Sequence, residues 1–145
     1  MKIAIDSNAA EFLLKHYGAE VYEGAQRGRW EVFLPIIVYA EQSVWKGHLA
    51  SAIIDGLSAQ VVPLDQNHAD ALGGMWDNLR GRPRPGESPE QLWRRHKCDW
   101  LIAAMCVRES WLLVSDDGDF QRIKDTVGLN VIKVDDFVQN HLTAP

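Results

Sequence analysis

The chain has few cysteines, no long apolar run and no excess of basic residues. Its two cysteines, Cys98 and Cys106, are eight positions apart on one expected helix, a spacing too long for a disulfide along a helix. No CxxC pair suggests zinc, so we expect two buried free thiols. No apolar run approaches the roughly 18 residues of a membrane span. The first acid, Asp6, comes too early for the apolar part of a secretory signal. These absences predict a soluble, cytoplasmic protein with no membrane partner.

The net charge of −5 at pH 7 argues against indiscriminate binding to nucleic acids, which usually needs a basic surface. The charge is unevenly distributed, however, because positions 80–97 hold six basic residues against Glu87 and Glu90. That segment carries +4 and leaves −9 for the remainder. A basic strip beside an acidic pocket suits a phosphate backbone held for cleavage, although a solvated loop and helix start would have a similar composition. The basic residues are Arg80, Arg82, Arg84, Arg94, Arg95 and Lys97.

Short apolar segments alternate with amphipathic ones along the whole chain. We expect strands at 2–6, 31–35, 61–64, 112–115 and 130–134, and Pro63 suits an edge strand. We expect helices at 7–18, 36–47, 49–57, 66–79, 89–110 and 119–127, with a last one from about Asp136. The proline-rich stretch 80–89 reads as a surface loop. This alternation predicts one α/β domain over residues 1–145, with a central parallel sheet of about five strands flanked by helices.

Four carboxylates stand where an expected strand ends or an expected helix runs: Asp6, Glu41, Asp99 and Asp117. The carboxyl ends of parallel strands share one edge of the sheet, which is where ligands bind in α/β folds. Crowded carboxylates repel one another, and some would be protonated unless a cation held them. Oxygen ligands favour Mg²⁺ or Mn²⁺. The pattern therefore predicts a metal site suited to hydrolysis of phosphodiesters.

Each acid also has a simpler structural explanation. Asp6 precedes a helix and could be its N-cap, and Glu41 could lie on a solvated helix face. Asp99 is the strongest candidate because it opens an apolar, core-like helical run, where an acid needs a partner. Turn chemistry alone could explain the acids at 116–119. We nevertheless expect Asp119 to assist Asp117, with Ser115 orienting one of them through a hydrogen bond.

In this order and at these intervals, the motifs IDSN (5–8), AE (40–41), DWLIAA (99–104) and VSDDGDF (114–120) resemble those of the PIN-domain family. The resemblance is closest to the small VapC-type toxin ribonucleases, and it covers essentially the whole chain. It implies a PIN-like fold and assigns metal-holding roles to Asp6, Glu41, Asp99, Asp117 and Asp119. Asn8 and Ser115 match polar positions that support the metal site. Serine replaces the more usual threonine at 115, and the loop before Asp99 is longer than the common pattern.

The resemblance implies a metal-dependent endoribonuclease using Mg²⁺ or Mn²⁺, the toxin of a type II toxin–antitoxin pair. It also implies a homodimer and a cognate antitoxin. On this interpretation the basic residues of 80–97 position the RNA, and Trp93 or Trp100 could stack on unpaired bases. The alternative is a catalytically silent PIN-like protein that binds RNA or a partner. A phosphatase-like α/β domain is disfavoured because Asp6-Ser7-Asn8 lacks the second aspartate of a DxD motif.

Overall fold

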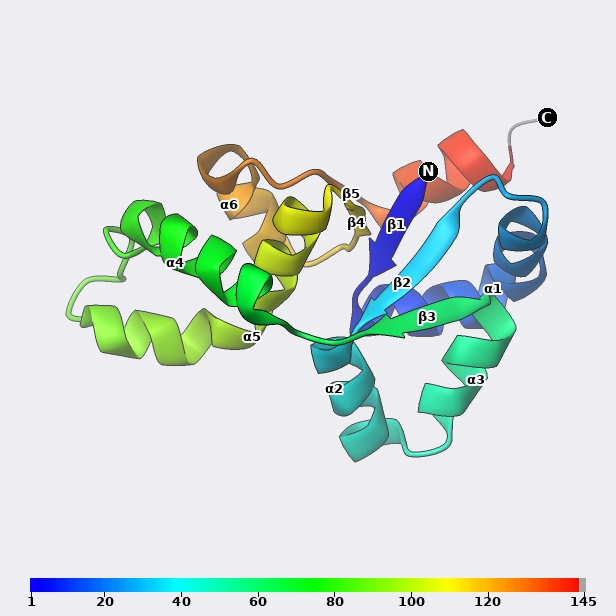
Figure 1. Ribbon diagram of the computed structural model, residues 1–145, viewed down its shortest axis with the longest axis horizontal. Helices are drawn as coiled ribbons and strands as arrows, with labels where there is room; N and C mark the ends of the chain where they lie inside the picture. Colours follow the sequence, from blue (N-terminus) through cyan, green and yellow to red (C-terminus); the bar gives the residue numbers. More distant parts are fainter. Residues whose placement is uncertain (144–145) are drawn as a thin grey trace.

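Five parallel strands form a single sheet at the centre of the computed structural model, which describes residues 1–143. The order across the sheet is β3-β2-β1-β4-β5 (Figure 1). The α/β fold with a five-stranded parallel sheet is therefore as the sequence predicted. The strands are β1 (Lys2–Ile5), β2 (Glu31–Pro35), β3 (Ala59–Val62), β4 (Leu112–Val114) and β5 (Val131–Ile132).

Strands β1 and β4 are neighbours at the middle of the sheet, and their positions follow from their sequences. Strands covered by helices on both faces are apolar throughout, and Ile3, Ala4 and Ile5 are all fully buried. In the register of the two strands Ile5 pairs with Val114. The sheet order reverses here, because β2 and β3 lie on one side of β1 while β4 and β5 lie on the other. Such a reversal leaves a crevice beyond the carboxyl ends of the strands.

The helices fall into two groups, with α1 to α3 contacting one another and α4 to α6 contacting one another (Figure 1). Right-handed crossovers on either side of β1 account for this division. None of the helices within residues 1–143 is both long and apolar enough to cross a membrane. They are α1 (Ser7–Gln26), α2 (Ile36–Lys46), α3 (Leu49–Leu57), α4 (Gln66–Leu79), α5 (Pro89–Glu109), α6 (Gly118–Val127), α7 (Val134–Phe137) and a π-helical turn η1 (Val138–Leu142).

Helices α4 and α5 form a hairpin that extends away from the sheet (Figure 1). Each begins with a capping box, made by Asp65 with His68 and by Ser88 with Gln91. The proline-rich positions 80–88 connect the two helices, as predicted for a surface loop. Trp76, Trp93 and Trp100 meet between them, with ring centroids 5.8–6.3 Å apart. Trp93 or Trp100 was expected to stack on unpaired bases. Trp100 is only 3% exposed, so this expectation is wrong for Trp100.

Two local expectations are also corrected. Helix α1 does not end at Gly18 but continues to Gln26 past a kink at Tyr17. A Cβ at Gly18 would make only ordinary contacts, with Leu14 Cδ1 at 3.7 Å and the Gly56 carbonyl oxygen at 3.9 Å. The two cysteines differ. Cys106 is buried, and burial raises the pKa of its thiol, whereas Cys98 is exposed because it lies on the solvent face of α5.

Candidate metal centre

The carboxyl ends of β1 and β4 bring Asp6 and Ser115 together. Asp6 directly follows β1 and Ser115 directly follows β4, so the pairing of Ile5 with Val114 makes them neighbours. The Ser115 hydroxyl donates a hydrogen bond to Oδ2 of Asp6. The same hydroxyl accepts a hydrogen bond from the backbone N–H of Asp117 at 3.0 Å. Ser115 is fully buried and so holds one acid in place while shaping the turn that carries the next. The sequence analysis expected Ser115 to orient Asp117 or Asp119, but the carboxylate that its hydroxyl holds is that of Asp6, and its contact with Asp117 is to the backbone N–H only.

Asp6 serves the structural role that was considered for it, and its role as a metal ligand stays a prediction. It is the N-cap of α1, and its Oδ1 accepts a hydrogen bond from the backbone N–H of Ala9 at 2.9 Å. It is also 8% exposed and lies at the edge of the crevice. Burial raises the pKa of Asp6, and the negative charges of Asp117 and Asp116 add to that rise. The hydrogen bonds from Ser115 and Ala9 oppose it. A cation beside this carboxylate would remove much of the cost of its charge.

Glu41 reaches the same region from α2. Its Oε2 accepts a hydrogen bond of 3.0 Å from the hydroxyl of Ser7, the residue after Asp6. On α2 the polar Gln42 is 3% exposed, while the apolar Trp45 is 80% exposed. Hydrophobicity alone does not predict this arrangement. The side-chain amide of Gln42 donates a hydrogen bond to the backbone carbonyl of Ser7 at 3.4 Å, which helps to hold Gln42 inside. Glu41 itself is half-buried beside it.

Asp99 lies at the centre of the acidic group. It is half-buried on α5, and its pKa is raised to about 7. Burial is the largest cause, followed by the negative charges of the other predicted ligands, Asp117, Asp119, Glu41 and Asp6 in that order. Four carboxylates from three separate segments thus act on one side chain. These acids are near enough for their charges to act on Asp99, but of the predicted ligands only Asp99 and Asp119 belong to the group of ligand atoms that lie within 4.8 Å of one another. The roles of all five as ligands stay predictions.

The turn after β4 sends its three acids in different directions. Asp116 accepts a hydrogen bond of 2.9 Å from the backbone N–H of Val134 and so braces the start of α7. Asp117 is the N-cap of α6, and its Oδ1 accepts from the backbone N–H of Asp119 at 2.9 Å. Asp119 Oδ1 pairs with the Arg122 guanidinium at 2.9 Å. Its other oxygen, Oδ2, is directed at a histidine on α5.

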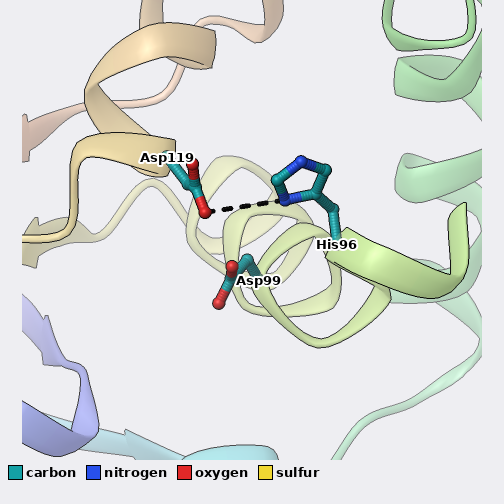
Figure 2. A group of neighbouring side chains, drawn as sticks. All are labelled: His96, Asp99 and Asp119. Atoms are coloured by element: carbon teal, nitrogen blue, oxygen red, sulfur yellow. Dashed lines mark ion pairs between the residues drawn. The ribbon is translucent and has the colours of Figure 1, made fainter. Parts of the chain in front are cut away.

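That histidine, His96, is the site residue that the sequence analysis missed. His96, Asp99 and Asp119 each offer a ligand atom, and these three atoms lie within 4.8 Å of one another (Figure 2). His96 Nδ1 is 3.6 Å from Asp119 Oδ2, too far for a hydrogen bond. It is buried without a hydrogen-bond partner among residues 1–143. Burial lowers the pKa of His96, and the neighbouring charge of Arg95 lowers it further. The signal was present as a His-x-x-Asp pair, since residues three apart share a helix face.

The donors present fit a divalent cation. Burial and then the surrounding carboxylates raise the pKa of Asp99, and a buried imidazole nitrogen beside them has no hydrogen-bond partner within residues 1–143. Both features cost free energy in the absence of a positive charge. Asn8, which was predicted to support the site, lies in the first turn of α1 with its side chain exposed. Its role stays a prediction.

The predicted RNA-binding residues are less alike than the sequence suggested. Arg94 pairs with Glu90 at 2.6 Å, and Arg95 pairs with Glu87 at 2.8 Å, so their charges are partly neutralised. Arg80 lies 3.9 Å from Asp77. Lys97 is exposed on α5. A cleft of about 190 Å³ next to the acidic group is lined by Arg82, Arg84, Arg95 and Arg122, together with His96 and Asp119. Arg122 was not among the predicted residues, because it stands alone outside the basic segment.

Comparison with known proteins gives matches at the level of structure. No family model matches the chain, and no curated protein sequence matches it. Three solved structures match nearly its full length. The first is VapBC2 from Rickettsia felis bound to a promoter DNA fragment, with 16% identity, 92% of this chain and 98% of the other covered, and a TM-score of 0.64. The second is VapBC-1 from nontypeable Haemophilus influenzae, with 19% identity, 93% of this chain and 99% of the other covered, and a TM-score of 0.62. The third is DNA-bound VapBC from Salmonella typhimurium, with 16% identity, 92% of this chain and 98% of the other covered, and a TM-score of 0.60.

These likenesses concern the fold. The chain shares its α/β architecture with chains of VapBC complexes over more than nine-tenths of its length. The chain therefore has the fold of chains found in VapBC complexes, and the predicted α/β, PIN-like fold is confirmed.

Proposed function

We propose that this protein is a metal-dependent endoribonuclease, the toxin of a type II toxin–antitoxin pair. The observation that carries the proposal is the state of Asp99, whose pKa is raised to about 7 by burial and by four surrounding carboxylates. An acid cluster of this kind at the carboxyl ends of the central strands suits a hard divalent cation, Mg²⁺ or Mn²⁺. The fold, which the chain shares with chains of VapBC complexes, supports the same proposed function.

In this proposal some residues of the chain hold the cation and others bind the RNA. Asp6, Glu41, Asp99 and Asp117 hold the cation with help from Asp119, and Ser115 fixes the carboxylate of Asp6. The cation, when bound, supplies the positive charge that activates water and stabilises the developing charge on the phosphate. The guanidinium groups of Arg82 and Arg84 bind the RNA backbone in the cleft beside Asp119. Trp93 is half-buried in the aromatic cluster of α4 and α5, where only part of its ring could meet a base.

We further propose that the chain forms a homodimer and binds a cognate antitoxin in the cytoplasm. The solved structures that share its fold are VapBC complexes, which supports an antitoxin partner. Val44 and Trp45, 76% and 80% exposed at the end of α2, provide apolar surface for an assembly. Light scattering of the purified chain, and co-purification with the product of an adjacent small reading frame, test these two proposals separately.

A cleavage assay tests the enzymatic proposal. The purified chain is incubated with single-stranded RNA and Mn²⁺ or Mg²⁺, with EDTA in a parallel reaction and with DNA of the same sequence for comparison. We expect cleavage of RNA that EDTA abolishes and that Asp99→Asn and Asp6→Asn remove. The matched control is Asp55→Asn, which changes an exposed aspartate on α3. Intact RNA under all conditions would favour the alternative, a PIN-like protein that binds RNA or a partner without cutting.

A further inference from the structure

A histidine lies among the carboxylates of the candidate metal centre. His96 and Asp99 are three residues apart on α5, so both side chains leave the same face of the helix. Asp119 approaches them from the first turn of α6 (Figure 2). The three ligand atoms lie within 4.8 Å of one another. Ligands of one ion at bond lengths near 2.1 Å are separated by about 3–4 Å, so small side-chain movements would bring all three onto one cation.

The contacts of His96 point in the same direction. Its ring stacks on Trp100 with centroids 5.4 Å apart and planes inclined by 21°, which fixes the ring orientation. Its side chain is 12% exposed, and Nδ1 is buried without a hydrogen-bond partner in the described part of the chain. A buried polar atom without a partner costs free energy, so an imidazole nitrogen held rigidly toward two carboxylates is unusual unless something binds it.

Asp119 is arranged to share its two oxygens. Oδ1 is paired with Arg122 at 2.9 Å, while Oδ2 faces His96 Nδ1 at 3.6 Å. The first contact orients the carboxylate, and the second oxygen stays available for a cation. Partners of this kind orient metal-binding side chains in many proteins. The His-x-x-acid spacing also matches the acid-x-x-His pairs with which helix bundles bind transition metals.

We infer that His96 is a nitrogen ligand of a divalent cation shared with Asp99 and Asp119, and that it makes the site selective for Mn²⁺ over Mg²⁺. Mg²⁺ binds almost entirely through oxygen. Mn²⁺ also favours oxygen ligands, but it is a first-row transition metal that binds mixed nitrogen and oxygen sites, so an imidazole ligand favours it over Mg²⁺. The inference rests on the proposed function in one respect, since Asp99 holds a cation in both. It goes further by naming a ligand outside the acidic set and the metal which that ligand favours.

Pulsed electron paramagnetic resonance of Mn²⁺ bound to the intact protein tests this directly. We expect modulation from a coordinated ¹⁴N nucleus in the unchanged chain. The signal should vanish in His96→Phe, which keeps an aromatic ring on Trp100 but removes both nitrogens. The matched control is His16→Phe, because His16 is an exposed histidine lying against Phe12 on α1. It should keep the signal.

Calorimetric titrations with Mn²⁺ and with Mg²⁺ supply the second readout. His96→Phe should weaken Mn²⁺ binding by at least about tenfold, since even the partners of metal ligands commonly contribute that much. Mg²⁺ binding should change by less than about twofold, because oxygen ligands dominate it. A spectrum of the unchanged chain without ¹⁴N coupling would overturn the inference, as would equal losses for both metals.

The two proposals fail separately. Nitrogen coordination in a protein that cuts no RNA would overturn the nuclease and leave the His96 ligand standing. Cleavage of RNA with no ¹⁴N coupling would do the reverse.

Discussion

The hydroxyl of Ser115 donates a hydrogen bond to Oδ2 of Asp6, a residue 109 positions earlier in the chain. This hydrogen bond connects the end of β4 to the end of β1, at the point where the order of the sheet reverses. The bond also opposes the rise that burial causes in the pKa of Asp6. One buried hydroxyl therefore keeps the first acid of the site oriented and easier to ionise.

Replacing this hydroxyl should weaken both the fold and the site. In Ser115→Ala we expect the pKa of Asp6 to rise further, because a hydrogen bond that lowers it is lost. The free energy of unfolding at pH 7 should fall by about 1–3 kcal/mol, the cost of leaving buried polar groups unpaired. Urea denaturation measures the change. Ser115→Thr keeps the hydroxyl and is the control; equal stability of all three proteins would refute the role assigned to this bond.

Asp99 should make stability depend on pH. Its pKa is about 7 in the folded chain and near 3.8 when the environment is removed. Between these values the folded state holds a proton that the unfolded state has released, so stability falls as pH rises from about 4 to about 7. Asp99→Asn carries no such charge. In metal-free buffer its Tm should exceed that of the unchanged chain at pH 8, and the difference should disappear near pH 4.

Adding Mn²⁺ should reverse that order at pH 8. The ion stabilises only a chain that binds it, so the unchanged protein should gain Tm while Asp99→Asn does not. Differential scanning calorimetry of both proteins, with Asp55→Asn as the matched control, measures the effect. A Tm difference between Asp99→Asn and the unchanged chain that stays constant from pH 4 to 8 would show that Asp99 does not lie in a crowded acidic site.

The basic residues should divide into two classes. Arg84 is exposed and lines the cleft beside the acidic group, whereas Arg94 is held by Glu90 at 2.6 Å. In an Asp99→Asn background, Arg84→Gln should weaken RNA binding and lower the salt slope by about one, as expected for one lost phosphate contact. Arg94→Gln should change little. Fluorescence anisotropy at several salt concentrations measures both, and similar losses for the two variants would contradict the division.

A stability test concerns the close packing of α1 against Trp30. A Cβ on Gly24 would lie 2.0 Å from Cζ2 of Trp30, whose indole N–H donates to the Val21 carbonyl at 3.0 Å. Gly24→Ala should therefore lower the free energy of unfolding by about 1–3 kcal/mol through overpacking. Gly73→Ala, on an exposed part of α4 with no atom within 4 Å of the new Cβ, should raise it by about 0.5–1 kcal/mol. Urea unfolding of both variants provides the comparison.

The sequence predicted those features that depend on local pattern. The apolar runs at β1 and β4 identified the buried strands, and acids directly after them marked the crevice edge, because parallel strands end together. Features that depend on tertiary contacts were missed. Gly18 looked like a helix end, but contact with α3 carries α1 past it. On α2 the polar Gln42 is buried and donates to the Ser7 carbonyl while Trp45 is exposed, an arrangement that hydrophobicity alone does not predict.

His96 shows the same limit at the site itself. Its spacing from Asp99 is visible in the sequence, but only the fold brings Asp119 to within 3.6 Å of its ring. Arg95 pairs with Glu87 of the loop before α5, which local pattern does not reveal, whereas the Arg94–Glu90 pair has the i,i+4 spacing that a helix brings together. The sequence therefore indicated the acids that act on Asp99, while their roles as ligands stay predictions, and it did not indicate the pairing of Arg95 with Glu87.

Anomalous X-ray scattering from crystals soaked in MnCl₂ tests the central claim most directly. The account predicts a manganese peak at the carboxyl ends of β1 and β4, in contact with Asp99 and at least one further acid of the group. A map with no peak at this edge of the sheet, or with manganese only at scattered surface acids, would contradict it.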